Sequence, residues 1–110
     1  MDYQIVWSPE AVADVEAIAS YIARDSAAYA QAVVEKILET ARQVGEFPSL
    51  GRMVPELAQE TIRERFVYSY RLIYRIRNDT ITIAAVIHGR RLLRPLRERL
   101  TGSEDDPAGA

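Results

Sequence analysis

The sequence has no cysteine, a single histidine and no long apolar run. Without cysteine there can be no disulfide or thiolate metal site, and one histidine makes a zinc site improbable, so we expect no metal and no cofactor. No stretch approaches the ~20 apolar residues that cross a bilayer, and residues 1–3 lack the basic start of a signal peptide. The expectation is a soluble, cytoplasmic protein without membrane association.

Lysine is almost absent from the basic residues, and the charges are unevenly distributed. Residues 1–50 carry three basic and eight acidic side chains, whereas residues 51–100 carry eleven arginines against five acidic side chains. This asymmetry indicates a surface that meets an anion, either nucleic acid or an acidic protein. The alternative, that the arginines only solvate the outer face of a sheet, stays open.

The length of 110 residues and a hydrophobic share of 48% fit one domain. We expect this domain to occupy residues 1–100. Residues 101–110 are polar and acidic, and we expect them to form a disordered tail.

The first half of the chain predicts a strand followed by two helices. Residues 3–7 favour a strand. Ser8 is a good N-cap for a helix over 9–24, and Ser26 can cap a second helix that Gly45 would end. The apolar residues of both helices recur at three- and four-residue spacing, and the short link between them predicts an αα-hairpin.

In the second half the helical spacing gives way to alternation after a loop at 47–52, where Gly51 is read as a turn former. The alternation predicts three strands, at 62–68, 70–77 and 80–88. Asn78 and Asp79 suit a two-residue hairpin turn. A short helix is expected at 94–100. The predicted fold class is α+β, with an N-terminal strand, an α-helical hairpin packed on a twisted antiparallel sheet, and a short C-terminal helix or tail.

Side-chain parity along the last two strands predicts two unlike faces. One face carries aliphatic and tyrosine side chains, and it must pack against the helix hairpin: Tyr70, Leu72, Tyr74, Ile76, Ile81, Ile83, Ala85 and Ile87. The other face would be open and basic, with Arg71, Arg75, Arg77 and His88 together.

Four stretches, in this order, resemble the RelE/ParE superfamily of toxins from bacterial type II toxin–antitoxin modules. They are "WSPEAVADVEAIASYIA" (7–23), "FPSLGR" (47–52), "YRLIYRI" (70–76) and "VIHGRR" (86–91). The resemblance implies the fold above and a hetero-oligomer with a cognate antitoxin, ParD-like or other. It also implies one of two targets, because RelE-like members cleave mRNA in the ribosomal A site and ParE-like members poison DNA gyrase.

For the nuclease reading, the resemblance assigns phosphate stabilisation to Arg71 and Arg91. His88 would then be the acid or base, completed by Glu46 or Glu64. Two departures weaken this reading. RelE-like enzymes tend to present lysines before the "YRLIY" motif, where this chain has "RER" at 63–65. They also place a tyrosine after the glycine–basic pair, and this chain has no tyrosine after residue 74.

We therefore expect a ParE-like toxin that poisons gyrase and is not an enzyme, and that acts in plasmid stabilisation and growth inhibition. Its docking element would be the Arg- and Leu-rich segment 90–100. The residues expected to bind the target or antitoxin are Arg71, Arg75, Arg77, Arg90, Arg91, Arg94 and Arg97. A RelE-like mRNA endonuclease using His88, Arg71 and Arg91 is the first alternative. An antitoxin-binding protein with little remaining toxicity is the second.

Overall fold

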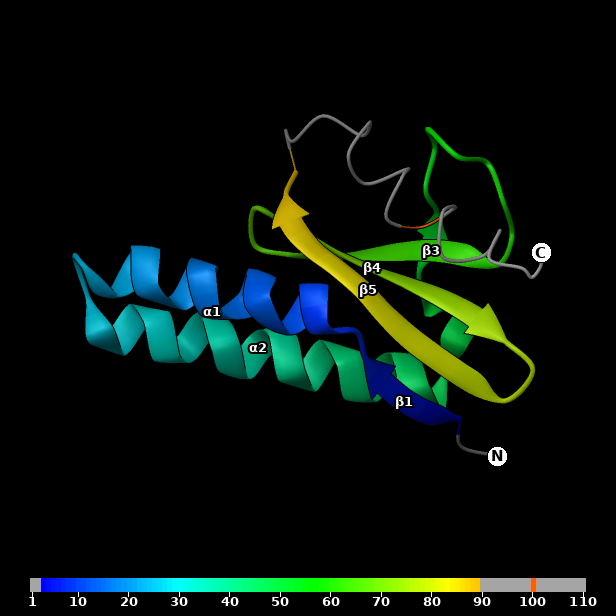
Figure 1. The fold of residues 1–110 in the computed structure, drawn as a ribbon, viewed down its shortest axis with the longest axis horizontal. Coiled ribbons are helices and arrows are strands. Elements are labelled where there is room, and N and C mark those ends of the chain that lie inside the picture. The colour runs from blue at the N-terminus through cyan, green and yellow to red at the C-terminus, as the bar shows by residue number, and fades with distance from the viewer. Residues whose placement is uncertain (1–2, 90–99, 101–110) are drawn as a thin grey trace.

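The computed structural model describes residues 3–89 and Leu100, and it contains a helix pair on one face of a five-stranded sheet (Figure 1). The elements are β1 (Gln4–Trp7), α1 (Pro9–Ala23), α2 (Ala27–Glu46), the 3₁₀ turn η1 (Pro48–Leu50), β2 (Arg52–Met53), β3 (Ile62–Val67), β4 (Tyr70–Arg77) and β5 (Thr80–His88). The predicted α+β class is confirmed. The expected helix at 94–100, apart from Leu100, and the expected tail at 101–110 lie outside the described residues.

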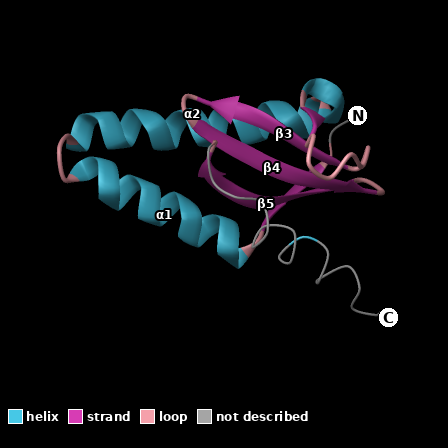
Figure 2. Ribbon diagram, turned by 90° about the horizontal axis from the view of Figure 1, so that it is seen from above, coloured by secondary structure: helices cyan, strands magenta, loops and turns pink. Residues whose placement is uncertain are grey.

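Both helices begin where their capping serines predict. The Ser8 hydroxyl accepts a hydrogen bond from the Ala11 amide at 3.0 Å, and the Ser26 hydroxyl accepts one from Tyr29 at 3.0 Å. Each bond satisfies an amide that the first helical turn leaves without a partner. The two helices lie antiparallel, and their connected end projects past the sheet (Figures 1 and 2).

Gly45 does not end α2, contrary to the prediction. The helix continues to Glu46, and Gly45 is buried within its last turn. A Cβ atom at Gly45 would lie 2.5 Å from Ile5 Cδ1, and the Gly45 carbonyl accepts a hydrogen bond from the Tyr3 amide at 3.0 Å. A side chain at this position would push the Ile5 side chain away, so Gly45 allows Ile5 of β1 to pack directly on α2, which no local pattern reveals.

The sheet order is β1-β5-β4-β3-β2, and β1 departs from the expected antiparallel arrangement. It pairs parallel to β5, with Gln4 opposite Thr80, while the other neighbours are antiparallel. The expected turn at Asn78 and Asp79 is confirmed, with φ of 55° at Asn78. A second tight turn joins β3 to β4, and there Tyr68 has the same left-handed φ of 55°.

A β-bulge in β5 changes which residues share a face. Ile73 of β4 lies opposite Ala85 and Tyr74 lies opposite Ile83, so that Ala84 is an extra residue in β5. The Ser8 hydroxyl donates a hydrogen bond to the Ala84 carbonyl at 3.3 Å, which ties the bulge to the start of α1. One extra residue reverses the side-chain alternation for the rest of the strand.

His88 consequently lies on the helix side of the sheet. It stands opposite Tyr70, and their rings meet edge to face with centroids 5.8 Å apart. The predicted grouping of His88 with Arg71 and Arg75 on one face is wrong. The expectation that Ala85 and Ile87 pack against the helices is wrong for the same reason, since both belong to the apolar cluster on the far side.

The far face of the sheet is also not the open surface that the parity predicts. The larger core lies between the helices and the sheet and includes Val33, Ile37, Leu72, Tyr74, Ile81 and Ile83. A second apolar cluster covers the far face: Val54, Ile62, Ile73, Ala84, Ala85 and Leu100. The stretch around Val54 thus folds over the far face and covers part of it from solvent.

Gly51 serves close packing, and it is not the turn former that the sequence predicts. Its φ of −79° and ψ of 155° are extended, and its amide donates to the Tyr74 hydroxyl at 3.0 Å. That hydroxyl donates in turn to the Pro48 carbonyl at 2.5 Å, so that Tyr74 fastens the loop to the sheet. A Cβ at Gly51 would collide with the Tyr74 ring and with the Glu64 carbonyl.

Tyr74→Phe is expected to lower the free energy of unfolding by about 1–3 kcal/mol, because it leaves the Gly51 amide and Pro48 carbonyl without their partner. Urea unfolding of the purified chain measures this loss. The control is Tyr21→Phe, whose side chain is exposed and which should change stability by less than about 0.5 kcal/mol. Equal effects of the two substitutions would contradict the role of the Tyr74 hydroxyl.

Candidate functional site

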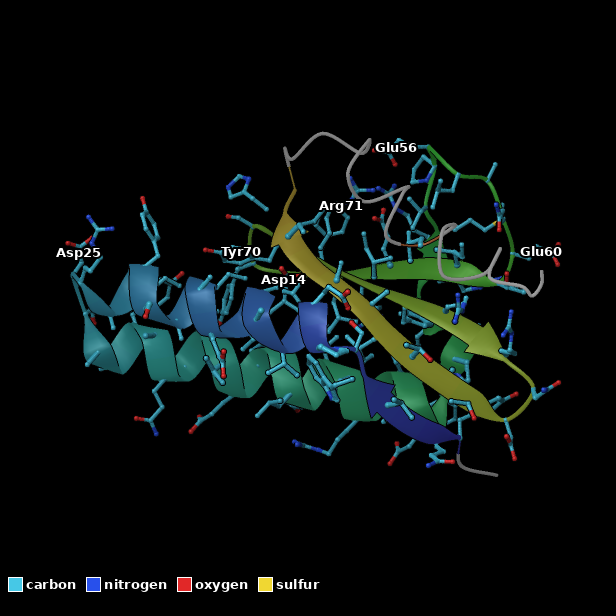
Figure 3. All side chains as sticks on the ribbon, in the orientation of Figure 1. Asp14, Asp25, Glu56, Glu60, Tyr70 and Arg71 are labelled. Carbon is cyan, nitrogen blue, oxygen red and sulfur yellow. The ribbon has the colours of Figure 1, made fainter. Side chains whose placement is uncertain are left out.

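Arg71 lies at the centre of a group of charged side chains on the far face of the sheet, here called the arginine–glutamate cluster: Arg52, Glu56, Glu64 and Arg71. Arg71 Nε donates to Glu64 Oε1 at 2.6 Å, and its two terminal nitrogens donate to Glu56 at 2.9 and 3.1 Å. Arg52 Nε donates to the other Glu64 oxygen at 2.7 Å. Figure 3 shows Arg71 and Glu56 on the side away from the helices.

The strand pairing brings Glu64 and Arg71 to the same face, because side chains alternate between the two faces along β3 and β4. Glu64 lies opposite Ile73 and Phe66 opposite Arg71, so all four share the far face. Glu64 is 1% exposed and Arg71 4% exposed, so the Arg71 guanidinium is occupied by carboxylates and is not the solvent-facing cation that the parity predicts. A buried carboxylate is tolerable here because two guanidinium groups offset its desolvation.

Pairing within the cluster keeps Glu56 and Arg71 in their charged forms. The hydrogen bonds from Arg71 lower the pKa of Glu56 below its ordinary value, and the same pairing with Glu56 raises the pKa of Arg71. An ionised carboxylate accepts hydrogen bonds only, and a guanidinium cannot act as a base in a protein. The Arg52 guanidinium also lies 5.4 Å from the centre of the Phe66 ring, which adds a cation–π contact at the rim.

The other predicted binding arginines are distributed differently. Arg75 lies on the far face opposite Ile62 and Thr82 and is half-buried, and Arg77 lies exposed opposite Thr80. Their role in binding stays a prediction. Four further predicted residues lie outside the described part of the chain: Arg90, Arg91, Arg94 and Arg97.

The side chains proposed to complete a nuclease with His88 do not gather around it. Glu64 belongs to the arginine–glutamate cluster on the opposite face from His88. Glu46 is the last residue of α2, whereas His88 lies near Tyr29 at the start of that helix, about 25 Å away along the helix axis. Within the described residues, no three acidic or histidine side chains form a group that could hold a metal ion.

His88 instead belongs to a second candidate site, here called the tyrosine cleft: Tyr21, Tyr29, Tyr68, Tyr70 and His88. Two adjoining hollows, of about 340 and 350 Å³, share Tyr21, Tyr70 and His88. The Tyr29 and Tyr68 rings pack with centroids 6.3 Å apart. Burial raises the pKa of Tyr70, and repulsion from Tyr29 and Tyr21 adds to the effect, so its hydroxyl stays protonated.

Comparison with known proteins gives the class of this chain. A family model described as the ParE toxin of the type II toxin–antitoxin system, parDE, matches residues 5–93. Toxin RelE2 of Caulobacter vibrioides is 33% identical over 90 residues, which are 81% of this chain and 98% of that protein. These matches and the fold define a toxin of the RelE/ParE superfamily.

Two solved structures share the fold at 19% identity. One is the chromosomal ParDE toxin–antitoxin system from P. aeruginosa, with a TM-score of 0.65 over 78% of this chain and 95% of that one. The other is the YoeB dimer from Staphylococcus aureus, with a TM-score of 0.56 over 80% of this chain and 98% of that one.

The chain belongs to the ParE toxin family. It is therefore the toxin of a type II toxin–antitoxin system, and members of this family pair with a cognate antitoxin. No helix in the described part of the chain is long and apolar enough to cross a membrane.

Two parts of these sites were missed by the sequence reasoning. Glu56 lies in the loop before β3 and has no periodic pattern to indicate that it meets Arg71. The tyrosines of the cleft come from α1, α2, the β3–β4 turn and the start of β4, and only the tertiary fold brings them together. The one signal in the sequence is that Tyr21 and Tyr29 fall outside the apolar stripes of their helices, which indicates that both are exposed.

Arg71→Met is expected to lower the free energy of unfolding by about 3–5 kcal/mol, because it removes one partner of a buried ion pair and leaves the Glu64 carboxylate poorly compensated. Arg52→Met is a matched control, since Arg52 contacts the same carboxylate from a side chain that is 60% exposed. Its cost should be about 0–1 kcal/mol. Urea unfolding of both variants measures the difference, and equal losses would contradict the central role of Arg71.

The Glu56–Arg71 pair should also make stability depend on pH. Because the folded-state pKa of Glu56 lies below the ordinary value of 4.5, its contribution is present above 4.5 and is lost as the pH falls through the folded-state pKa. Glu56→Gln should therefore be less stable than the wild type at neutral pH and converge with it in acid. Urea midpoints across this range measure the effect, and a difference independent of pH would refute it.

Proposed function

We propose that this toxin stops growth by poisoning DNA gyrase in the cytoplasm and is neutralised by tight binding of its cognate antitoxin. The observation that carries the proposal is the separation of Arg71 from His88. Arg71 is held by two carboxylates on the far face of the sheet, and His88 lies on the helix side.

Cleavage of RNA through its own 2′-hydroxyl requires a base, an acid and a cation around one phosphate. A phosphate would have to displace Glu56 or Glu64 from Arg71, and both are bound by short charge-assisted hydrogen bonds. The match of residues 5–93 to the ParE toxin family supports the same target class. On this proposal the gyrase-docking element is the basic segment 90–100.

A ribosome-dependent mRNA endonuclease is the second candidate. The observation that favours it is the 33% identity to Toxin RelE2 over nearly the whole of that protein. In this alternative His88, Arg71 and Arg91 would form the active site, and binding of the ribosome would have to bring them together. A third candidate is an antitoxin-binding protein that has lost most of its toxicity.

Controlled expression of the toxin, with analysis of DNA and mRNA from the same cells, distinguishes these candidates. We expect supercoiling defects and double-strand breaks, with ribosome-associated mRNA left intact. His88→Gln serves as the internal test, and it should keep full toxicity because His88 has no catalytic part in gyrase poisoning.

Codon-proximal mRNA cuts with intact DNA would overturn the proposal in favour of the endonuclease. Loss of toxicity in His88→Gln, at unchanged stability and antitoxin affinity, would do the same. Normal growth with both nucleic acids intact would support the third candidate.

A further inference from the structure

The tyrosine cleft lies where the helix hairpin leaves the sheet, and neither the fold nor the proposed action on gyrase accounts for it. Four of the six tyrosines in the sequence line this one region. Tyr21 and Tyr68 are 65% and 57% exposed, so their rings contribute little to the core. Exposed tyrosines gathered around a hollow are typical of binding surfaces, because they offer a large apolar area with a hydrogen-bonding tip.

Tyr68 gives independent support that the cleft has a role other than stability. It occupies a two-residue turn with φ of 55°, a left-handed conformation that glycine or asparagine adopts more easily. A bulky side chain at such a position is strained, and strained residues cluster at functional sites. In this turn the Tyr68 ring packs against Tyr29, where it forms one wall of the cleft.

The charge around the cleft indicates what kind of group it accepts. Asp25 and Asp14 line the two hollows, and Figure 3 shows Asp14 beside Tyr70 on the side of α1. The Asp14 carboxylate also accepts a hydrogen bond from the Val86 amide of β5 at 2.9 Å. The first fifty residues, which include the hairpin, carry eight acidic side chains against three basic ones. The carboxylates of Asp14 and Asp25 therefore favour a cation over a phosphate at these hollows.

One ring of the cleft already contacts a cation, which comes from the end of its own helix. The Arg24 guanidinium lies 5.5 Å from the centre of the Tyr21 ring, within the range of a cation–π interaction. The remaining aromatic faces come from Tyr29, Tyr68 and Tyr70. A long basic side chain would pack its aliphatic part on these rings while its charged end lies near the carboxylates.

We propose that the tyrosine cleft receives an arginine or lysine side chain from a segment of the antitoxin. The partner segment would present this cation between apolar residues, so that the rings are covered when the cation is bound. The inference rests on the pairing of the toxin with an antitoxin and does not depend on whether gyrase or the ribosome is the target.

The test measures the affinity of the full toxin for the antitoxin encoded in the same operon, by titration calorimetry. Tyr21→Ala and Tyr68→Ala should each weaken binding at least about fivefold, as truncation of a central interface aromatic does. Tyr21→Phe should retain most of the affinity, because it keeps the ring. Phe47→Ala is the matched control, since Phe47 is 61% exposed at the other end of α2 and should leave the affinity unchanged.

The second arm changes each arginine and lysine of the antitoxin singly to methionine and combines it with Tyr21→Ala. We expect one basic position whose effect is not additive with Tyr21→Ala, which identifies the inserted side chain. Poly(U) RNA, added as a competitor, should not displace the antitoxin.

Affinities within about twofold of the wild type for both tyrosine variants would overturn the proposal, because an interface aromatic contributes more than this. Coupling found only at apolar antitoxin positions would overturn it as well, and so would displacement of the antitoxin by RNA from the wild type but not from Tyr21→Ala. Failure of the gyrase assignment would change the damage seen in cells and leave these affinities unaltered, so the two proposals fail separately.

Discussion

The β-bulge at Ala84 decides which side chains at the end of β5 lie on each face of the sheet in this toxin. One additional residue in β5, tied to the cap of α1 through Ser8, reverses the alternation over the last part of the strand. Ala85 and Ile87 then fill the far face, while Val86 and His88 turn toward the helices. Without the bulge, His88 and Arg71 would share one face, and the molecule would present a different site.

The two faces that result have different electrostatic characters. On the far face, the arginine–glutamate cluster neutralises its own charges, because its two arginines and two glutamates bind one another. Such a cluster fixes the orientation of β2, β3 and the loop before β3 more than it adds stability, since the desolvation of buried ions offsets much of their attraction. The helix side instead leaves aromatic rings and carboxylates at the surface, where a partner can use them.

Local signals in the sequence predicted most of the secondary structure but few of the contacts that form the candidate sites. The caps at Ser8 and Ser26 and the turn at Asn78 are determined by residues close in the chain, and the structure confirms them. The role of Gly45 was mistaken because its cause is Ile5, on another element. Arg71 was mistaken for a surface cation because its partner Glu56 comes from an irregular loop. Parity correctly described β4 but could not reveal an insertion in β5.

The parallel pairing of β1 with β5 has a consequence for the order in which the toxin is made. Among the described residues the first strand pairs with β5 alone, and Ser8 is 76 residues from the carbonyl it binds at Ala84. The helix hairpin, with its local contacts, can form while synthesis continues, but the sheet closes only after β5 has left the ribosome. A nascent chain that stops before β5 therefore lacks the strand with which β1 pairs and the residues Ile81 and Ile83 of the larger core.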